Sequence, residues 1–183
     1  MRMTTHRLVL VPPTGAETTE FRAMNADPRV MAHFASPLDS AESDDLLARF
    51  RDSWGAYGIG PWSVFHEGRY AGFAGLLPMR KRLPLSAPFD LVYRFQVAHH
   101  GAGLAAEAAR AALVHAFARH WCDEVVAFTA HSNDKSLALM ARLGFQRLPE
   151  MDFDHPDLPP GHALRPHKVA RISRECVIGG PRP

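Results

Sequence analysis

The segment HGAGLA at residues 100–105 combines small residues in a way that suits anion binding. Gly101 and Gly103 tolerate tight turns, so the backbone N–H groups around them can point at one spot. The segment precedes an alanine-rich run, and a helix that begins here adds its unsatisfied N-terminal amides. An anion such as a pyrophosphate would be stabilised there. Glycine-rich turns also serve as plain connections between a strand and a helix, and this loop alone leaves both interpretations open.

The same loop lacks the common nucleotide-binding motifs. It has neither the Lys-Ser/Thr pair of a P-loop nor the GxGxxG pattern of a dinucleotide fold. ATP and NAD are therefore poor candidates as ligands.

Eleven histidines raise the question of a metal site. The strongest candidates gather late in the chain, where His155, His162 and His167 lie near Asp152 and Asp154. Their spacings match no compact ligand pattern, and proline-rich loops often carry histidine at the surface. We predict no metal site.

The length of 183 residues predicts one domain that spans residues 1–183. The contents of 46% hydrophobic and 22% charged residues are ordinary globular values and argue against disorder. A formal net charge of +2 creates no strong basic field, so we expect neither nucleic acid nor a membrane as a partner. No run of 18 residues is free of charge, and two cysteines are too few for a disulfide scaffold. We expect a soluble protein of the reducing cytoplasm.

Alternating strands and helices must position the loop. Hydrophobic periodicity and turn residues predict the order β-α-α-β-β-β-α-β-α-β-β, which indicates a mixed sheet with helices on its faces. Asp39 and Ser40 both offer N-cap oxygens to the second helical unit. Arg110 lies one helical turn after Glu107 and is expected to pair with it. The expected strands are 7–11, 61–66, 70–79, 89–97, 124–129, 144–148 and 167–177, and the expected helices lie within 14–34, 39–54, 103–121 and 133–143.

Four short segments in a fixed order carry a family resemblance. They are YRFQV at 93–97, HGAGLAAE at 100–107, NDKS at 133–136 and LGF at 143–145. Together they resemble the GNAT superfamily of acyl-coenzyme A-dependent N-acetyltransferases. The second segment is similar to the WGRGLATE-like motif of the RimJ/RimL branch, whose members acetylate protein N-termini or small amines. The resemblance runs from about Thr5 to Ser173.

The resemblance implies an α+β fold with a mixed, mostly antiparallel central sheet of about seven strands. The sheet would be splayed between its fourth and fifth strands and would carry helices on both faces. The implied activity is direct transfer of an acetyl group from acetyl-CoA, without a metal, to a primary amine. The acceptor would be a protein N-terminal α-amine or a small-molecule amine, and an acidic acceptor groove would favour a cationic drug. Dimerisation stays open.

The resemblance also implies which residues hold the coenzyme. The pantetheine arm would pair in β-like fashion with the end of the fourth strand, and the loop amides would hold the pyrophosphate. Asn133 and Ser136 would approach the pantetheine and the sulfur, although Asn133 also suits a plain helix N-cap. The expected coenzyme-binding residues are Phe95, Gln96, Val97, His100, Gly101, Ala102, Gly103, Leu104, Ala105, Asn133 and Ser136.

Acetyl transfer needs a base for the amine and a donor to the oxyanion. The resemblance points to Asp90, at a position where relatives usually carry glutamate, although a surface carboxylate fits the sequence equally well. It also points to His155 or its neighbour Asp154, with Asp152 as a competitor. A backbone N–H near residues 95–97 would stabilise the oxyanion.

Two positions depart from the family pattern. Many GNAT enzymes protonate the leaving thiolate with a tyrosine five residues before the Gly-Phe phenylalanine, and this chain has Met140 there. We expect Ser136 to take that role. His100 stands where many relatives carry Gln, Arg or Trp, which changes the charge of the loop and not its backbone donors. Met140 keeps open the alternative of a GNAT-like domain that binds acyl-coenzyme A without turnover.

Overall fold

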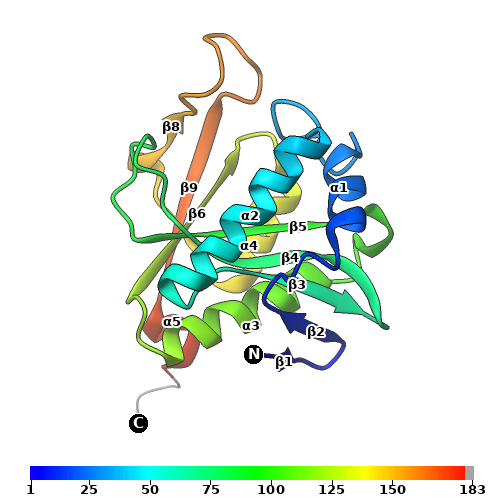
Figure 1. The fold of residues 1–183 in the computed structure, drawn as a ribbon. Coiled ribbons are helices and arrows are strands. Elements are labelled where there is room, and N and C mark those ends of the chain that lie inside the picture. Colours follow the sequence, from blue (N-terminus) through cyan, green and yellow to red (C-terminus); the bar gives the residue numbers. More distant parts are fainter. Residues whose placement is uncertain (180–183) are drawn as a thin grey trace.

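The computed structural model describes residues 1–179, which fold into one sheet with helices on both faces (Figure 1). The strands are β1 (Met3–Thr4), β2 (Leu8–Val11), β3 (Pro61–His66), β4 (Arg69–Pro78), β5 (Phe89–Phe95), β6 (Glu124–Ala130), β7 (Gln146–Arg147), β8 (Phe153–Asp154) and β9 (Pro166–Ser173). The helices are α1 (Thr18–Ala26), α2 (Ser40–Tyr57), α3 (Leu104–Ala118), α4 (Asp134–Leu143) and α5 (Arg174–Ile178), with 3₁₀ turns η1 (Val97–His99) and η2 (Pro149–Met151).

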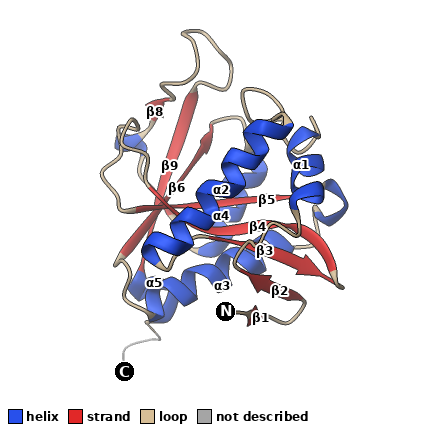
Figure 2. Cartoon of the chain, in the orientation of Figure 1, coloured by secondary structure: helices blue, strands red, loops and turns tan. Residues whose placement is uncertain are grey.

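The sheet runs in the order β1-β2-β3-β4-β5-β6-β9-β7, and β8 pairs with β9. Among the described strands, β5 and β6 form the one parallel pair, and they share the single register position Asp90↔Val126. Figure 2 shows β5 and β6 running in clearly different directions. The expected fold, mostly antiparallel and splayed at this pair, is confirmed.

The two faces of the sheet are covered by different helices. Helices α1 and α2 pack on β4 through a cluster that includes Phe21, Phe50 and Phe73, and the rings of Phe50 and Phe73 are 4.9 Å apart between centroids. Helices α3 and α4 pack on the other face around Leu113 and Met140. Successive side chains of a strand point to opposite faces. Alternate residues of β5 therefore serve two separate layers.

Local sequence signals define several element ends. The Asp39 carboxylate accepts from the Glu42 N–H at 2.8 Å and Glu42 reaches back to the Asp39 N–H at 2.9 Å, so the expected N-cap of α2 is present as a capping box. Glu67 and Gly68 both have positive φ angles, 51° and 76°, and form the two-residue hairpin loop between β3 and β4.

The bounds of three expected strands were wrong. The strand predicted at 144–148 covers only Gln146–Arg147, because Gly144 still caps α4. The strand predicted at 89–97 ends at Phe95, because the chain then turns into η1, where the His99 N–H donates to Gln96 O at 2.9 Å. The strand predicted at 167–177 ends at Ser173, since the Arg174 N–H turns to Asp123 O at 2.8 Å and α5 follows.

Gly72→Ala should destabilise the protein strongly. Gly72 has φ +151°, and a Cβ atom there would lie 2.1 Å from Arg94 O in the neighbouring strand. The expected loss is about 2 kcal/mol or more of unfolding free energy, measured by urea denaturation. Gly55→Ala is the control, because nothing lies within 4 Å of its Cβ position inside α2, and it should stabilise by about 0.5–1 kcal/mol. Equal unfolding midpoints for Gly72→Ala and wild type would contradict this role of Gly72.

Candidate active site

The loop after η1 presents a set of free backbone donors. Gly101 and Gly103 both have φ +77°, and Gly103 is the N-cap of α3 without a side-chain cap. Across residues 1–179, no acceptor is recorded for the N–H groups of 101–105. Consecutive N–H groups of such a turn, joined to a helix N-terminus, form a concave site for an anion.

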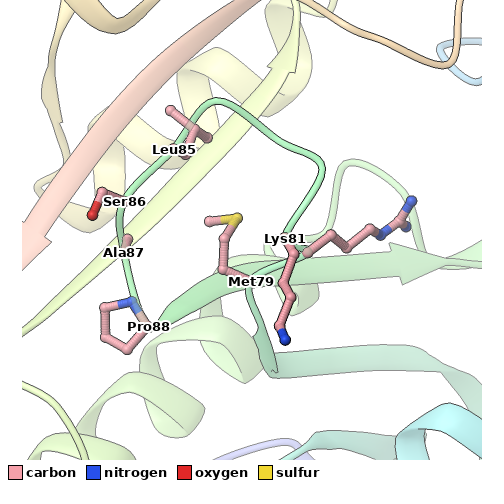
Figure 3. A pocket seen from close by; sticks show the side chains of 7 residues that line it. Met79, Lys81, Leu85, Ser86, Ala87 and Pro88 are labelled. Carbon is pink, nitrogen blue, oxygen red and sulfur yellow. The ribbon is translucent and has the colours of Figure 1, made fainter.

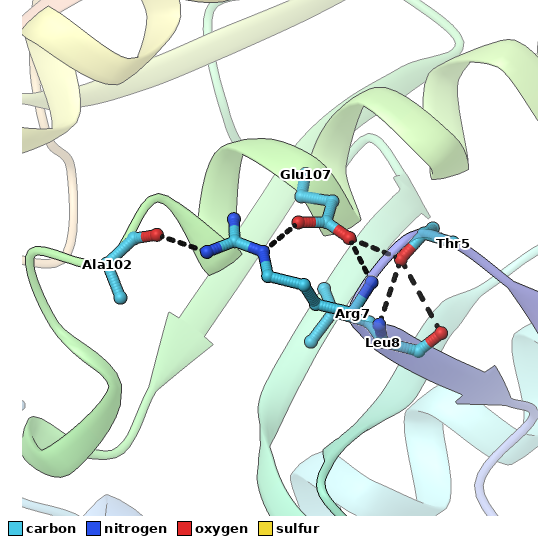
Figure 4. A network of polar contacts seen from close by, with 5 residues as sticks. All are labelled: Thr5, Arg7, Leu8, Ala102 and Glu107. Atoms are coloured by element: carbon cyan, nitrogen blue, oxygen red, sulfur yellow. Dashed lines mark hydrogen bonds and ion pairs between the residues drawn. The ribbon is translucent and has the colours of Figure 1, made fainter.

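A polar network braces this loop from the N-terminal strands (Figure 4). Arg7 Nε donates to Glu107 Oε2 at 2.7 Å, and Arg7 Nη1 donates to Ala102 O at 2.8 Å. Thr5 Oγ1 and the Arg7 N–H both donate to Glu107 Oε1, at 2.6 and 2.9 Å. Burial acts to raise the pKa of Glu107, but these hydrogen bonds outweigh it and hold the pKa below its usual value. Arg7 thereby ties the start of β2 to the loop.

The expected pair of Glu107 with Arg110 is wrong. The Glu107 carboxylate faces the segment that joins β1 to β2, where the N–H and guanidinium of Arg7 and the hydroxyl of Thr5 meet it. Three hydrogen bonds and the charge of Arg7 hold it there, whereas an exposed pair one helical turn apart contributes little.

The segment between β5 and the loop differs from the expected extended strand. Val97 lies in η1, and its carbonyl accepts from the His100 N–H at 3.0 Å. The Gln96 N–H donates to Ala71 O at 2.9 Å, and His100 Nε2 lies 2.9 Å from Phe95 O. Within the described chain the Val97 N–H has no recorded acceptor. The Val97 N–H is therefore a free backbone donor for a ligand that lies along this segment.

Asn133, Ser136 and Tyr93 come together beside the opening between β5 and β6. Asn133 caps α4, because its Oδ1 accepts from the Ser136 N–H at 3.2 Å while its Nδ2 donates to Thr129 Oγ1 at 2.9 Å. The Ser136 hydroxyl lies 2.5 Å from the Tyr93 hydroxyl. Burial raises the pKa of Tyr93 although the bond to Ser136 acts to lower it, so the phenol keeps its proton at neutral pH.

Tyr93 was missed as a candidate because periodicity placed it among the apolar residues of its strand. Only the approach of the α4 N-terminus brings a hydroxyl partner to it. Met140, by contrast, is 2% exposed in the core between α4 and the sheet. Its side chain offers no proton, and Tyr93 and Ser136 supply the hydroxyls on this side of the sheet.

Asp90 is a buried carboxyl at the register position that joins β5 to β6. Burial raises the pKa of Asp90 to about 7, against the opposing charges of Arg80 and Arg49. The alternative of a surface carboxylate does not hold, since the residue is 9% exposed. A carboxyl with this pKa is poised to exchange a proton near neutral pH.

His155, Asp154 and Asp152 lie on and around β8. Burial and the charge of His167 lower the pKa of His155, whose ring is 4.9 Å from that of His167. Asp154 pairs with Arg165 at 3.1 Å. The Asp152 carboxylate accepts from Arg147 and from the Val169 N–H, and these contacts give it a structural role. No hydrogen bond between His155 and Asp90 is recorded in the part of the chain described.

No metal centre or membrane-spanning helix is found in residues 1–179. No group of three or more His, Cys, Asp and Glu side chains is placed to hold a metal ion in that range. None of its helices is long and apolar enough to cross a membrane.

The chain is similar to known acetyltransferases. Residues 7–146 match the model of the acetyltransferase (GNAT) domain family. An acetyltransferase of this family from Bordetella pertussis is 28% identical, with a TM-score of 0.77 over 94% of this chain and 99% of that one. The ribosomal-protein α-N-acetyltransferase RimL, solved with coenzyme A, is 12% identical with a TM-score of 0.78 over 94% and 98% of the chains. Spermidine N-acetyltransferase from Vibrio cholerae, solved with CoA and spermine, is 15% identical with a TM-score of 0.74 over 94% and 99%.

Glu107→Gln should weaken binding of coenzyme A. The change keeps the shape of the side chain and removes the charge that holds Arg7, so the loop loses its brace. The expected loss is about fivefold in affinity, measured by calorimetric titration. Arg110→Gln on the same helix is the control and should leave the affinity unchanged. A Glu107→Gln variant that binds as wild type does would show that the loop holds its shape without the brace.

Asp90→Asn should flatten the pH dependence of stability. The folded protein, with a pKa of about 7 at Asp90, holds a proton that the unfolded chain, with a pKa near 3.9, releases. Wild-type stability therefore falls as the pH rises from about 4 to about 7 and then levels off, and the Asn variant lacks this loss. Each pKa unit is worth about 1.4 kcal/mol, so the variant should be more stable by a few kcal/mol at pH 8 and equal to wild type at pH 4. Urea midpoints at both pH values test this, and matching midpoints at pH 8 would refute it.

Proposed function

The chain belongs to the acetyltransferase (GNAT) domain family, and from this premise we propose that it transfers an acetyl group from acetyl-CoA to a primary amine. The acceptor is a protein N-terminal α-amine or a small-molecule amine, as in the RimJ/RimL branch. The single observation that carries the proposal is the set of free N–H groups at 101–105, which opens α3 next to the divergence of β5 from β6. The free N–H groups suit a pyrophosphate, and the gap between the diverging strands suits the arm that carries the thioester.

The coenzyme would lie along one side of this opening. The N–H groups of Gly101 to Ala105 would hold the pyrophosphate, with His100 beside them. The pantetheine arm would follow Phe95, Gln96 and the free N–H of Val97. Asn133 and Ser136, at the start of α4, would border the arm on the side of β6. The Asn133 side chain also caps α4.

The reaction is an aminolysis of the thioester. The neutral amine attacks the carbonyl carbon, a C–N bond forms, and the charge that develops on the oxygen is stabilised by a backbone N–H near the end of β5. The C–S bond then breaks. The Tyr93–Ser136 pair, 2.5 Å apart between hydroxyl oxygens, donates a hydrogen bond and a proton to the leaving sulfur. The base takes the proton that the amine loses, and exchange with water then removes that proton from the base and returns one to the Tyr93–Ser136 pair.

Asp90 is the base that the geometry favours. It lies where the two strands join, and its raised pKa of about 7 lets it accept a proton from the amine at neutral pH. His155 is the second candidate, since its lowered pKa keeps the imidazole neutral, the form that can accept a proton. Asp154 is the third candidate, and its carboxylate is engaged by Arg165.

A domain that binds acyl-CoA without turnover is the alternative function. This alternative arises because Met140 stands where many GNAT enzymes carry the tyrosine that protonates the leaving thiolate. The hydroxyls of Tyr93 and Ser136 supply another proton donor beside the opening, and this favours a catalytic protein over a sensor.

Ser136→Ala should separate chemistry from binding. Titration with acetyl-CoA, followed by thiol release with a panel of amines, measures both in one sample. If the Tyr93–Ser136 pair acts on the leaving sulfur, the variant should lose about 10- to 100-fold in kcat while the coenzyme affinity stays within about twofold.

Ser132→Ala, the same change at an exposed neighbour, is the control. Equal losses of binding and turnover in Ser136→Ala would reduce Ser136 to a coenzyme contact. Failure of the wild-type protein to bind acetyl-CoA would overturn the proposed function.

A further inference from the structure

The face of the sheet opposite α3 and α4 is the side from which an acceptor approaches the thioester. The proposed coenzyme contacts lie at the starts of α3 and α4, which leaves the other face to the amine. Val92 of β5 packs with α1 and α2 on that other face, whereas Leu91 packs with α3. Because side chains alternate along a strand, Asp90 lies on the same face as Val92.

Four aromatic side chains gather on this face at β6, β8 and β9. Ala127 of β6 and Ala170 of β9 pack in the cluster of α3 and α4. Phe128 and His167 alternate with these alanines and therefore point to the other face. Phe153 of β8 pairs with His167 and shares its face. We refer to Phe128, Phe153, His155 and His167 as the ring cluster.

The rings of this cluster contact one another and stay partly exposed. The Phe153 ring lies 5.6 Å from that of Phe128 and 5.6 Å from that of His167 between centroids, and it is tilted by only 27° from the latter. The rings of His155 and His167 are 4.9 Å apart. All four side chains are partly exposed, and none belongs to the three apolar core clusters of the described chain. The ring cluster is therefore an aromatic surface that a ligand can reach.

The ring cluster borders the opening between β5 and β6. The two strands join at Asp90↔Val126, and Phe128 is the next residue of β6 on the same face. At about 3.3 Å per residue, Phe128 lies about 7 Å beyond the junction. Asp90 on one strand and Phe128 on the other therefore lie at the same end of the opening. A short linker between an amine and an aromatic ring suits this spacing.

The two imidazoles of the ring cluster leave one donor and one acceptor free. His155 Nδ1 accepts from the Asp157 N–H at 3.3 Å, so the neutral ring carries its proton on Nε2. His167 Nδ1 lies 3.0 Å from the Arg165 carbonyl oxygen, which can only accept, so the His167 proton is on Nδ1 and its Nε2 has a lone pair. Burial lowers the pKa of both imidazoles and keeps them neutral. Neither Nε2 has a hydrogen-bond partner within residues 1–179.

The loop between β4 and β5 borders the ring cluster beside His155. Asp157 pairs with Arg82 of this loop at 2.6 Å, and His155 Nδ1 lies 3.9 Å from the same carboxylate. Figure 3 shows the residues, 79–81 and 85–88, that line a cavity of about 370 Å³ within the loop. The loop is thus anchored by an ion pair around unfilled space, and close packing does not seal the ring cluster on this side.

A polyamine suits this surface poorly. The carboxylates beside the ring cluster are already paired, Asp157 with Arg82 at 2.6 Å and Asp154 with Arg165 at 3.1 Å. A second ammonium group would have to displace an arginine from one of them. The neutral rings and the two free nitrogens instead suit an uncharged aromatic group that carries one polar atom.

We propose that the acceptor is an arylalkylamine with a hydroxyl group on its ring. This inference rests on the proposed function and narrows its acceptor class. The aromatic ring stacks on the ring cluster, and the hydroxyl donates to His167 Nε2 and accepts from the Nε2–H of His155. The imidazole centroids, 4.9 Å apart, allow one hydroxyl to bond to both nitrogens. The amine then lies at the Asp90 end of the opening.

Three amines test the preference. Tyramine and phenethylamine differ in the ring hydroxyl, and phenethylamine and butylamine differ in the ring. Thiol release from acetyl-CoA at pH 8 is measured for each. We expect kcat/KM to rise about tenfold from butylamine to phenethylamine and about tenfold again to tyramine.

His167→Phe should remove the preference for the hydroxyl. The change keeps a ring in the cluster and removes the nitrogen lone pair, so the ratio of kcat/KM for tyramine over phenethylamine should fall from about ten to about one. Calorimetric titration of tyramine into the protein saturated with coenzyme A gives the same comparison without turnover. If His167→Phe does not fold, His155→Phe provides the same ratio, which the loss of a base shared by both amines does not alter.

His162→Phe is the matched control. His162 Nδ1 accepts from the Leu164 N–H at 3.1 Å, the same backbone arrangement as at His155. No ring contact joins His162 to the ring cluster within residues 1–179. This variant should keep the wild-type ratio.

The outcomes separate the two proposals. Equal kcat/KM for tyramine and phenethylamine, a His167→Phe ratio equal to that of His162→Phe, or a preference for spermidine over tyramine would overturn the hydroxyaryl acceptor and leave the acetyltransferase standing. Tyramine binding that depends on His167 without thiol release would keep the site and overturn the transferase. Neither binding nor release for any amine would overturn both.

Discussion

One register position holds the two halves of the sheet together. The strands β5 and β6 meet only at Asp90↔Val126, and beyond it they separate. The antiparallel strands on either side are paired over many residues, so the opening is fixed by rigid walls. A gap inside a sheet leaves backbone groups of two strands without mutual partners, and a ligand arm between them can supply those partners. The loop of free amides and the Tyr93–Ser136 pair lie around this opening.

The positions of the site residues depend on contacts distant in sequence. Glu107 on α3 takes its charge partner from Arg7, 100 residues earlier, and Arg7 in turn holds Ala102 of the loop. The His155 segment is linked to the loop before β5 through Asp157, which binds Arg82. Each functional loop is thus tied to a neighbouring segment, and this limits the freedom that short glycine-rich turns otherwise have.

Features with local causes could be predicted from the sequence, and those with distant causes could not. The capping box at Asp39 depends on residues within one turn, and the left-handed Gly101 and Gly103 depend on the absence of a side chain. The predicted partner of Glu107 was wrong because helical spacing favours Arg110 and carries no information about Arg7, which precedes β2 in the chain. Tyr93 looked like a core residue for the same reason. The family resemblance anticipated the splay, whereas the short strands β1 and β8 exist only through pairing with β2 and β9.

The alternation of side chains along β5 has a consequence for evolution. Leu91 and its alternates lie in the layer of α3, and Asp90 and Arg94 lie in the layer of α1 and α2. Substitutions in the second set, or in the loop of residues 79–88, leave the first set untouched. The residues of β5 that face α1 and α2 can therefore change between related proteins while the residues that face α3 stay the same. An insertion of a single residue within β5, however, would exchange the two sets at once, so selection should tolerate changes of length in the loop and reject them in the strand.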